Sequence, residues 1–284
     1  MKTNYQKTKV ILTFDLEFWW NNPLLEPYLP RDKNTLFDFT EESTRSLLDL
    51  LRKHQVRATF FILGELAQKH PDLIKDIFKA GHEIASHGYS HKNLWDLDER
   101  EFEKEIKLTN QIIENIIGFI PKGFRSPSFS LNQKTKWALN ILERNGFLYD
   151  SSLFPVQTPL YGVADAPLDI HRISNNLIEI PLAVYQLFKL RIPVAGGFYF
   201  RVTPLGIYLY LLKLSAKERI PVLYFHPREL YDFVPRVKGI PWWIKKIQFH
   251  GVKNSFERFK VLLENFECIS IKDYLSTHVL SKKL

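Results

Sequence analysis

The sequence has little cysteine, no periodic glycine or proline, and no long apolar run. Cys268 is the only cysteine in 284 residues, which excludes an internal disulfide framework and a cysteine-based zinc site. Cys268 lies in the strand-like run 267–271, so we expect a buried thiol. The 12 glycines and 16 prolines follow no period, which excludes collagen-like and low-complexity architectures.

The chain also shows no targeting or membrane-spanning segment. Residues 1–7 lack the apolar core of a secretory signal. The most apolar window, residues 205–214, is about half as long as a bilayer-spanning helix. We therefore expect a cytoplasmic protein, with peripheral contact to the inner membrane or to a biosynthetic complex left open.

Basic residues outnumber acidic ones, at 39 Lys+Arg against 31 Asp+Glu. A basic surface favours anionic partners such as phosphate-bearing glycans, acidic lipid headgroups or nucleic acid. The basic residues are dispersed and no nucleic-acid-binding motif occurs, so we expect no nucleic-acid partner. The hydrophobic content of 45% is sufficient for a large core and excludes extensive disorder.

Strand-like and helix-like segments alternate along the chain. Continuous apolar runs predict buried strands, and apolar residues at helical spacing predict the helices between them. The predicted strands are 10–14, 57–62, 82–86, a short strand ending at 124–125, 147–149, 177–180, 222–225 and 268–271. Such β-α repeats without a glycine-rich phosphate loop favour an α/β fold whose parallel sheet closes into a complete or distorted barrel. We expect one domain over 1–284, with loops and a hairpin in 155–205.

Five predicted strands end in polar residues: Asp15, His87, Arg125, Asp150 and His226. Each has an ordinary structural explanation when taken alone, such as a turn aspartate or a core histidine. Barrel active sites, however, are built at the carboxyl ends of the strands. Because all five share that position, the sequence predicts that they form one site.

Two more residues extend this set. Glu17 lies two positions after Asp15, so in an extended strand both side chains point to one side. His91 lies four positions after His87, the spacing of a metal-binding pair on a helix, although Gly88 disfavours a regular helix there. His82 begins a predicted strand rather than ending one, and we expect it to be structural.

These residues carry a resemblance to the polysaccharide deacetylase family, the NodB homology domain of carbohydrate esterase family 4. Residues 13–17, Thr-Phe-Asp-Leu-Glu, resemble the family's first motif, usually Thr-Phe-Asp-Asp-Gly. The other motifs are similar to residues 86–91, 125–128, 150 and 224–227. Longer phrases are similar to the subfamily of bacterial exopolysaccharide gene clusters, at 124–130, 149–155, 196–201 and 225–230.

The resemblance covers residues 8–276. It implies a distorted (β/α) barrel with about seven parallel strands. The motif core is then about 8–230, and about 231–276 is a family-specific C-terminal part.

The resemblance also implies one divalent metal ion, with Zn²⁺ as the expected ion. Leu16 stands where the family has a metal-binding Asp, and its side chain cannot coordinate an ion. We expect Glu17 to replace it, so that Glu17, His87 and His91 bind the metal and leave a position open for water. The alternative is that Glu17 only hydrogen-bonds nearby and metal binding is weak or absent.

Catalytic roles follow from the same resemblance. Asp15 is the expected general base and His226 the general acid. Arg125 is expected to orient Asp15, and a backbone N–H near Ser128 to hold the oxyanion. Asp150 is expected to accept a hydrogen bond in this network, either raising the pKa of His226 or pairing with Arg125.

The implied activity is hydrolysis of a linear amide, removing N-acetyl groups from amino sugars of a polysaccharide or a lipid-linked glycan. Trp19 and Trp95, together with Phe18, Trp20 and Tyr28, either stack on sugar rings or pack loops onto the barrel. Residues 242–246, Trp-Trp-Ile-Lys-Lys, are either core or an interfacial patch for lipid headgroups. Two alternatives stay open: a metal-independent amidohydrolase or deformylase of the same fold, and a non-catalytic glycan-binding protein.

Overall fold

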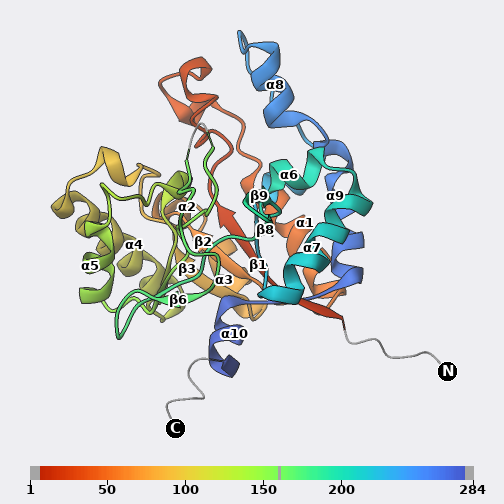
Figure 1. The fold of residues 1–284 in the computed structure, drawn as a ribbon. Helices are drawn as coiled ribbons and strands as arrows, with labels where there is room; N and C mark the ends of the chain where they lie inside the picture. Colours follow the sequence, from red (N-terminus) through yellow and green to blue (C-terminus); the bar gives the residue numbers. More distant parts are fainter. Residues whose placement is uncertain (1–6, 159–160, 279–284) are drawn as a thin grey trace.

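The centre of the protein is a curled, mainly parallel sheet (Figure 1). A computed structural model describes residues 7–158 and 161–278. The sheet contains β1 (Thr8–Leu16), β2 (Thr59–Ile62), β3 (Glu83–Ser86), β4 (Gly123–Phe124), β5 (Tyr149–Asp150), β6 (His171–Arg172), β7 (Ile178–Glu179), β10 (Val222–Phe225) and β11 (Phe266–Ile269). Their order is β10-β1-β2-β3-β4-β5-β7-β6, and β11 also pairs with β1. Only β6, in this nine-stranded sheet, is antiparallel to its neighbour, which confirms the distorted (β/α) barrel with slightly more parallel strands than expected.

Helices connect the strands and cover the sheet (Figure 1). They are α1 (Thr40–Lys53), α2 (Gly64–Lys69), α3 (Pro71–Lys79), α4 (Glu99–Ile117), α5 (Trp137–Arg144), α6 (Gly197–Val202), α7 (Leu205–Glu218), α8 (Trp242–Phe249), α9 (Val252–Asn265) and α10 (Ile271–His278). Short 3₁₀ turns are η1 (Glu26–Tyr28), η2 (Lys33–Thr35), η3 (Leu94–Asp96), η4 (Pro127–Phe129) and η5 (Pro227–Leu230). The capping box of Asp98 and Glu101 begins α4, and Gly118 ends it in the left-handed conformation. No helix within the described ranges is both long and apolar enough for a bilayer crossing.

Strand β1 pairs with strands from both the first and the last part of the sequence. It pairs with β2 on one side, and with β10 and β11 on the other. The backbone N–H of Ala183 donates to the carbonyl of Val222 (3.0 Å), so the segment after β7 returns to β10 and the sheet curls back on itself. The fold therefore brings the carboxyl ends of β1, β3, β4, β5 and β10 to one edge.

The C-terminal half of the chain agrees with most of the sequence expectations, with a shift at one strand. The strand expected at 268–271 is β11, which ends at Ile269, and α10 begins at Ile271. Residues 242–246 begin α8, and Ile244 alone among them is buried. The hairpin expected within 155–205 is present as β8 (Val184–Leu187) and β9 (Leu190–Pro193). Cys268 is buried as expected, and burial raises the pKa of its thiol to about 12.

His82 has the structural position that the sequence predicts. Its side chain is buried, and its Nδ1 accepts a hydrogen bond from the backbone N–H of Ala58 (3.2 Å). Burial, together with the nearby Arg57 cation, lowers the pKa of His82 to about 4. The folded protein therefore keeps this imidazole neutral at pH values where the unfolded chain protonates it.

We predict that His82 makes the fold sensitive to acid. An unfolded histidine binds its proton near pH 6.5, and His82 in the folded state binds one only near pH 4. The free energy of unfolding should thus decrease as the pH falls through this window, by on the order of 3 kcal/mol. Urea unfolding of the wild type and of His82→Asn at pH 7, 5.5 and 4.5 measures this. Equal losses of stability in both proteins would refute the assignment.

Candidate active site

Strand β1 delivers two carboxylates to one cavity. Leu16 packs in the apolar core, while Asp15 and Glu17 on either side of it both line a cavity of about 620 Å³. This is the alternation expected of a strand, and it leaves Leu16 unable to reach the site. Other predicted site residues that line the same cavity are Trp19, His87, His91, Trp95, Ser128 and His226. Arg125 and Asp150 are buried beneath them.

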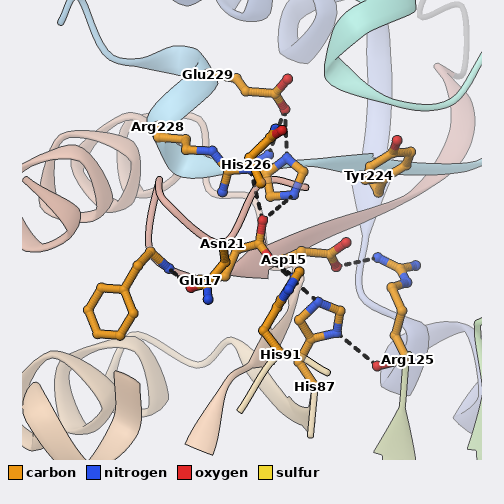
Figure 2. Close-up of polar contacts among 12 residues, drawn as sticks. Asp15, Glu17, Asn21, His87, His91, Arg125, Tyr224, His226, Arg228 and Glu229 are labelled. Carbon is orange, nitrogen blue, oxygen red and sulfur yellow. Dashed lines mark hydrogen bonds and ion pairs between the residues drawn. The ribbon is translucent and has the colours of Figure 1, made fainter. Parts of the chain in front are cut away.

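Glu17, His87 and His91 form the candidate metal centre. One ligand atom from each lies within 4.8 Å of the others. Glu17 Oε2 is 3.8 Å from His87 Nε2 and contacts His91 Nε2 (Figure 2). His87 Nδ1 hydrogen-bonds to the carbonyl of Arg125 (2.8 Å), which turns its Nε2 toward Glu17. The histidine pair lies on the loop after β3 and not on a helix, because Gly88 and His91 have φ values of 75° and 60°.

The two oxygens of the Glu17 carboxylate have different surroundings. Oε1 accepts from Arg228 Nη2 (2.8 Å) and lies 3.1 Å from His226 Nε2. Oε2 is buried and accepts no regular hydrogen bond from the described residues. Burial would raise the pKa of Glu17, but His91, Arg228 and His226 outweigh it and hold the pKa well below its ordinary value. An ionised oxygen that faces two imidazoles fits a divalent cation.

Arg125 connects the strand ends beneath the cavity. Its Nη1 donates to Asp15 Oδ1 (2.7 Å) and to Thr13 Oγ1 (2.8 Å), so the expected contact with Asp15 is present (Figure 2). Its Nε and Nη2 donate to the carbonyl and hydroxyl of Ser151. The guanidinium is fully buried and lies 4.0 Å from the ring centre of Phe61. These contacts fix the position of the Asp15 carboxylate.

His226 lies between two carboxylates. Its Nε2 faces Glu17, and its Nδ1 is 2.9 Å from Glu229 Oε2 (Figure 2). Burial and Arg228 would lower the pKa of His226, but Glu17 and Glu229 outweigh them and raise it to about 9. The two carboxylates therefore favour the protonated imidazole, which is the form that a general acid requires.

Arg228 and Glu229 contact the site, although the sequence motifs predict no role for either residue. The spacing His226-Pro-x-Glu229 is the sequence feature that could have indicated a role for Glu229. At the start of η5, Glu229 accepts a hydrogen bond from the backbone N–H of His226. Glu229 is held in turn by Arg201 Nη2 (3.2 Å). A Cβ at Gly197 would collide with the Glu229 carboxylate, so the glycine lets α6 approach η5.

Asp150 has different partners from those expected. Its carboxylate accepts from Ser152 Oγ (2.6 Å) and shares a hydrogen bond with Glu179, and burial raises the pKa of both carboxyls. The direct bonds of the Arg125 guanidinium go elsewhere, and the carboxylates beside His226 are Glu17 and Glu229. Asp150 thus forms a buried acid pair with Glu179, between β5 and β7, while the nearby Arg125 cation opposes the rise in its pKa, and its expected role in the network stays a prediction.

The aromatic residues of the first loop mainly pack the protein. Phe18 and Trp20 are buried and stack on each other, with ring centres 4.6 Å apart. Trp19 is also buried, and its Nε1 donates to the carbonyl of Phe37 (2.9 Å). Trp95 is half exposed at the cavity. Ser128, in η4, also borders the cavity and has a left-handed backbone, with φ of 51°.

Comparison with known proteins identifies the family of this chain. The family model described as polysaccharide deacetylase matches residues 2–147, more than half of the chain. The chain belongs to the polysaccharide deacetylase family. A second family model, described as a domain of unknown function, matches residues 151–276.

Several curated relatives of this chain are named as peptidoglycan deacetylases. The chain is 38% identical over 135 residues to the peptidoglycan-N-acetylglucosamine deacetylase of Bacillus cereus, covering 47% of the chain and 42% of the relative. It is 23% identical over 248 residues to the peptidoglycan deacetylase of Helicobacter pylori, covering 74% and 82%. The chain spans 33–42% of the length of three of the curated relatives that it matches.

Solved structures show the same fold. A Mycobacterium smegmatis protein described as a polysaccharide deacetylase aligns with a TM-score of 0.62 and 22% identity, covering all of this chain and 94% of the other. A Bacillus anthracis protein described as a CE4 family pseudoenzyme aligns with a TM-score of 0.50 and 16% identity, covering 95% and 66%. At these identities the likeness shows the fold alone, so function has to be argued from the site.

We predict that Arg125→Met lowers the free energy of unfolding by about 3–5 kcal/mol, because it leaves Asp15 as a buried, unpaired charge. Urea unfolding followed by tryptophan fluorescence measures the loss. Asp15→Asn/Arg125→Met should lose clearly less than the sum of the two single variants. Arg52→Met, which removes an exposed ion pair with Asp49, is the control and should cost about 0–1 kcal/mol. Additive losses would show that the pair is not coupled.

Proposed function

We propose that the protein hydrolyses the N-acetyl amide of amino sugars in a glycan, using a bound divalent metal, with Zn²⁺ as the expected ion. The observation that carries this proposal is the buried, ionised Glu17 Oε2 that faces His87 and His91 without a regular hydrogen bond. The names of the relatives support the substrate class, because they specify N-acetylglucosamine of peptidoglycan and chitooligosaccharides. The glycan is either a polysaccharide or a lipid-linked precursor.

The chain's own residues supply the remaining chemistry. When bound by Glu17, His87 and His91, a metal ion would lower the pKa of a water molecule and polarise the acyl carbonyl. Asp15, oriented by Arg125, accepts a proton from the attacking water.

His226, protonated between Glu17 and Glu229, donates a proton to the leaving amine. The backbone N–H near Ser128 stabilises the oxyanion at the cavity wall. The amide C–N bond breaks, and the products are acetate and a free amino sugar.

We also propose that residues 1–284 act as one catalytic domain. β1 has β10 and β11 as its partners on one side, and both lie beyond the segment 2–147 that the first family model matches. His226 and Arg228, which contact Glu17, also lie beyond that segment. The exopolysaccharide-cluster subfamily and the cytoplasmic location remain predictions from the sequence.

Metal content tests the proposed ligand set. Purified wild type should contain about one zinc or similar ion per chain, and Glu17→Ala and His87→Ala should each lose it, because three protein ligands are needed for a catalytic site of this kind. Elemental analysis after reconstitution measures the content. Glu65→Ala, an exposed carboxylate outside the ligand set, is the control. A wild type that takes up no metal would instead support the metal-independent amidohydrolase or the glycan-binding protein.

His226→Ala tests the general acid. Turnover of an N-acetylglucosamine oligomer, measured as acetate release, should decrease by about 10² or more, while metal content is retained. His54→Ala, a partly buried histidine on the surface after α1, is the control and should leave turnover unchanged. Wild-type turnover in His226→Ala would remove His226 from the mechanism.

A further inference from the structure

Helix α8 presents an exposed apolar face beside the cavity. Trp242 and Trp243 are 76% and 45% exposed, and Ile247 on the next turn is also exposed, while Ile244 anchors the helix in the core. In Figure 1, α8 projects from the end of the molecule to which β1 points, and the loop between β1 and α1 projects from the same end. Exposing two tryptophan side chains to water costs free energy, and an exposed apolar patch of this kind marks an interaction surface.

The charges around this face have one sign. From residue 233 to residue 256 the chain contains no Asp or Glu. Five lysine and arginine side chains in this stretch are exposed: Lys253 in α9, and four that precede or belong to α8, namely Arg236, Lys238, Lys245 and Lys246. None of the four forms an ion pair with another residue that the structure describes. We call Trp242, Trp243, Ile247 and these four basic residues the α8 face.

The α8 face continues into the candidate active site. Trp243 and Ile247 line the same cavity as Glu17 and His226, together with Phe233. The ring of Phe233 lies 5.6 Å from that of Phe37, which is 63% exposed on the loop after β1. An apolar wall therefore runs from the exposed tip of the molecule to the reacting residues.

A second cavity adjoins the first and has a different character. It also measures about 620 Å³ and shares His91 and Asn21 with the first cavity. Its other walls include Lys33, Lys69 and Lys92. The second cavity thus gives the site a polar side suited to hydroxyl-rich sugars. The first cavity gives it an apolar side, which a sugar alone would not cover with apolar contacts.

We propose that the α8 face docks on an anionic lipid bilayer, so that the apolar cavity receives the lipid-proximal end of a lipid-linked glycan. The docking surface stands on the α8 geometry, and the substrate assignment rests on the proposed deacetylase function. Tryptophan and lysine together are typical of surfaces that lie at the headgroup level of a membrane. The unpaired cations complement anionic headgroups. A second copy of the chain is the poorer partner, because a symmetric contact would bring these cations against each other.

Vesicle binding tests the proposal. The wild type should sediment with vesicles that contain about 30% phosphatidylglycerol, and much less with pure phosphatidylcholine vesicles, since each lysine near an anionic surface adds to binding. Trp242→Ser/Lys245→Glu/Lys246→Glu should weaken binding at least tenfold. All three residues lie outside the cavity lining, so the variant should retain wild-type acetate release from a soluble N-acetylglucosamine oligomer. Phe119→Ser/Lys213→Glu/Lys217→Glu is the control, which changes one exposed aromatic side chain and two exposed lysines elsewhere on the surface, and it should bind as the wild type does.

The two readouts separate the two proposals. Wild-type binding that is equal on anionic and neutral vesicles, or unchanged in the α8 variant, overturns the docking surface whatever the activity. Anionic-selective binding that the α8 variant loses supports the docking surface, even if the wild type releases no acetate. That last result would refute the proposed deacetylase function and not the docking surface.

Discussion

The site depends on how the charge of Glu17 is compensated. A carboxylate that is 6% exposed is stable as an anion only if nearby groups replace the water that it has lost. Arg228 and His226 compensate one oxygen and leave the other directed at two imidazoles. The same anion, together with Glu229, raises the pKa of His226, so one buried charge both shapes the candidate metal centre and favours the protonated form of the candidate acid.

Much of this arrangement could be predicted from sequence because it follows from strand periodicity and parallel topology. Alternation along β1 places Asp15 and Glu17 in the cavity and Leu16 in the core. Parallel pairing of β3 and β4 places His87 beside Arg125, close enough for a hydrogen bond from side chain to backbone. Neither inference requires knowledge of loop conformation, since a strand fixes the direction of its side chains.

The contacts of the candidate active site that the sequence did not predict depend on the conformation of loops, turns and very short strands. Arg228 reaches Glu17 only because η5 turns the chain back immediately after β10. Asp150 pairs with Glu179 because β7, a strand of two residues, lies next to β5. Such a short strand has no periodicity to detect, so its register and the partner that it supplies cannot be read from the sequence.

The candidate active site is assembled across two stretches of chain that match different family models. Residues 2–147 supply Glu17, the two histidines and Arg125, and residues 151–276 supply His226, Arg228 and Glu229. The α8 face belongs to the second stretch as well, and it meets the loop after β1 through Phe233 and Phe37. Residues 151–276 therefore supply the cations that compensate the Glu17 carboxylate. They also form the apolar wall that leads to it from the α8 face. A change in this stretch can alter which substrates reach the site while the candidate metal ligands stay the same.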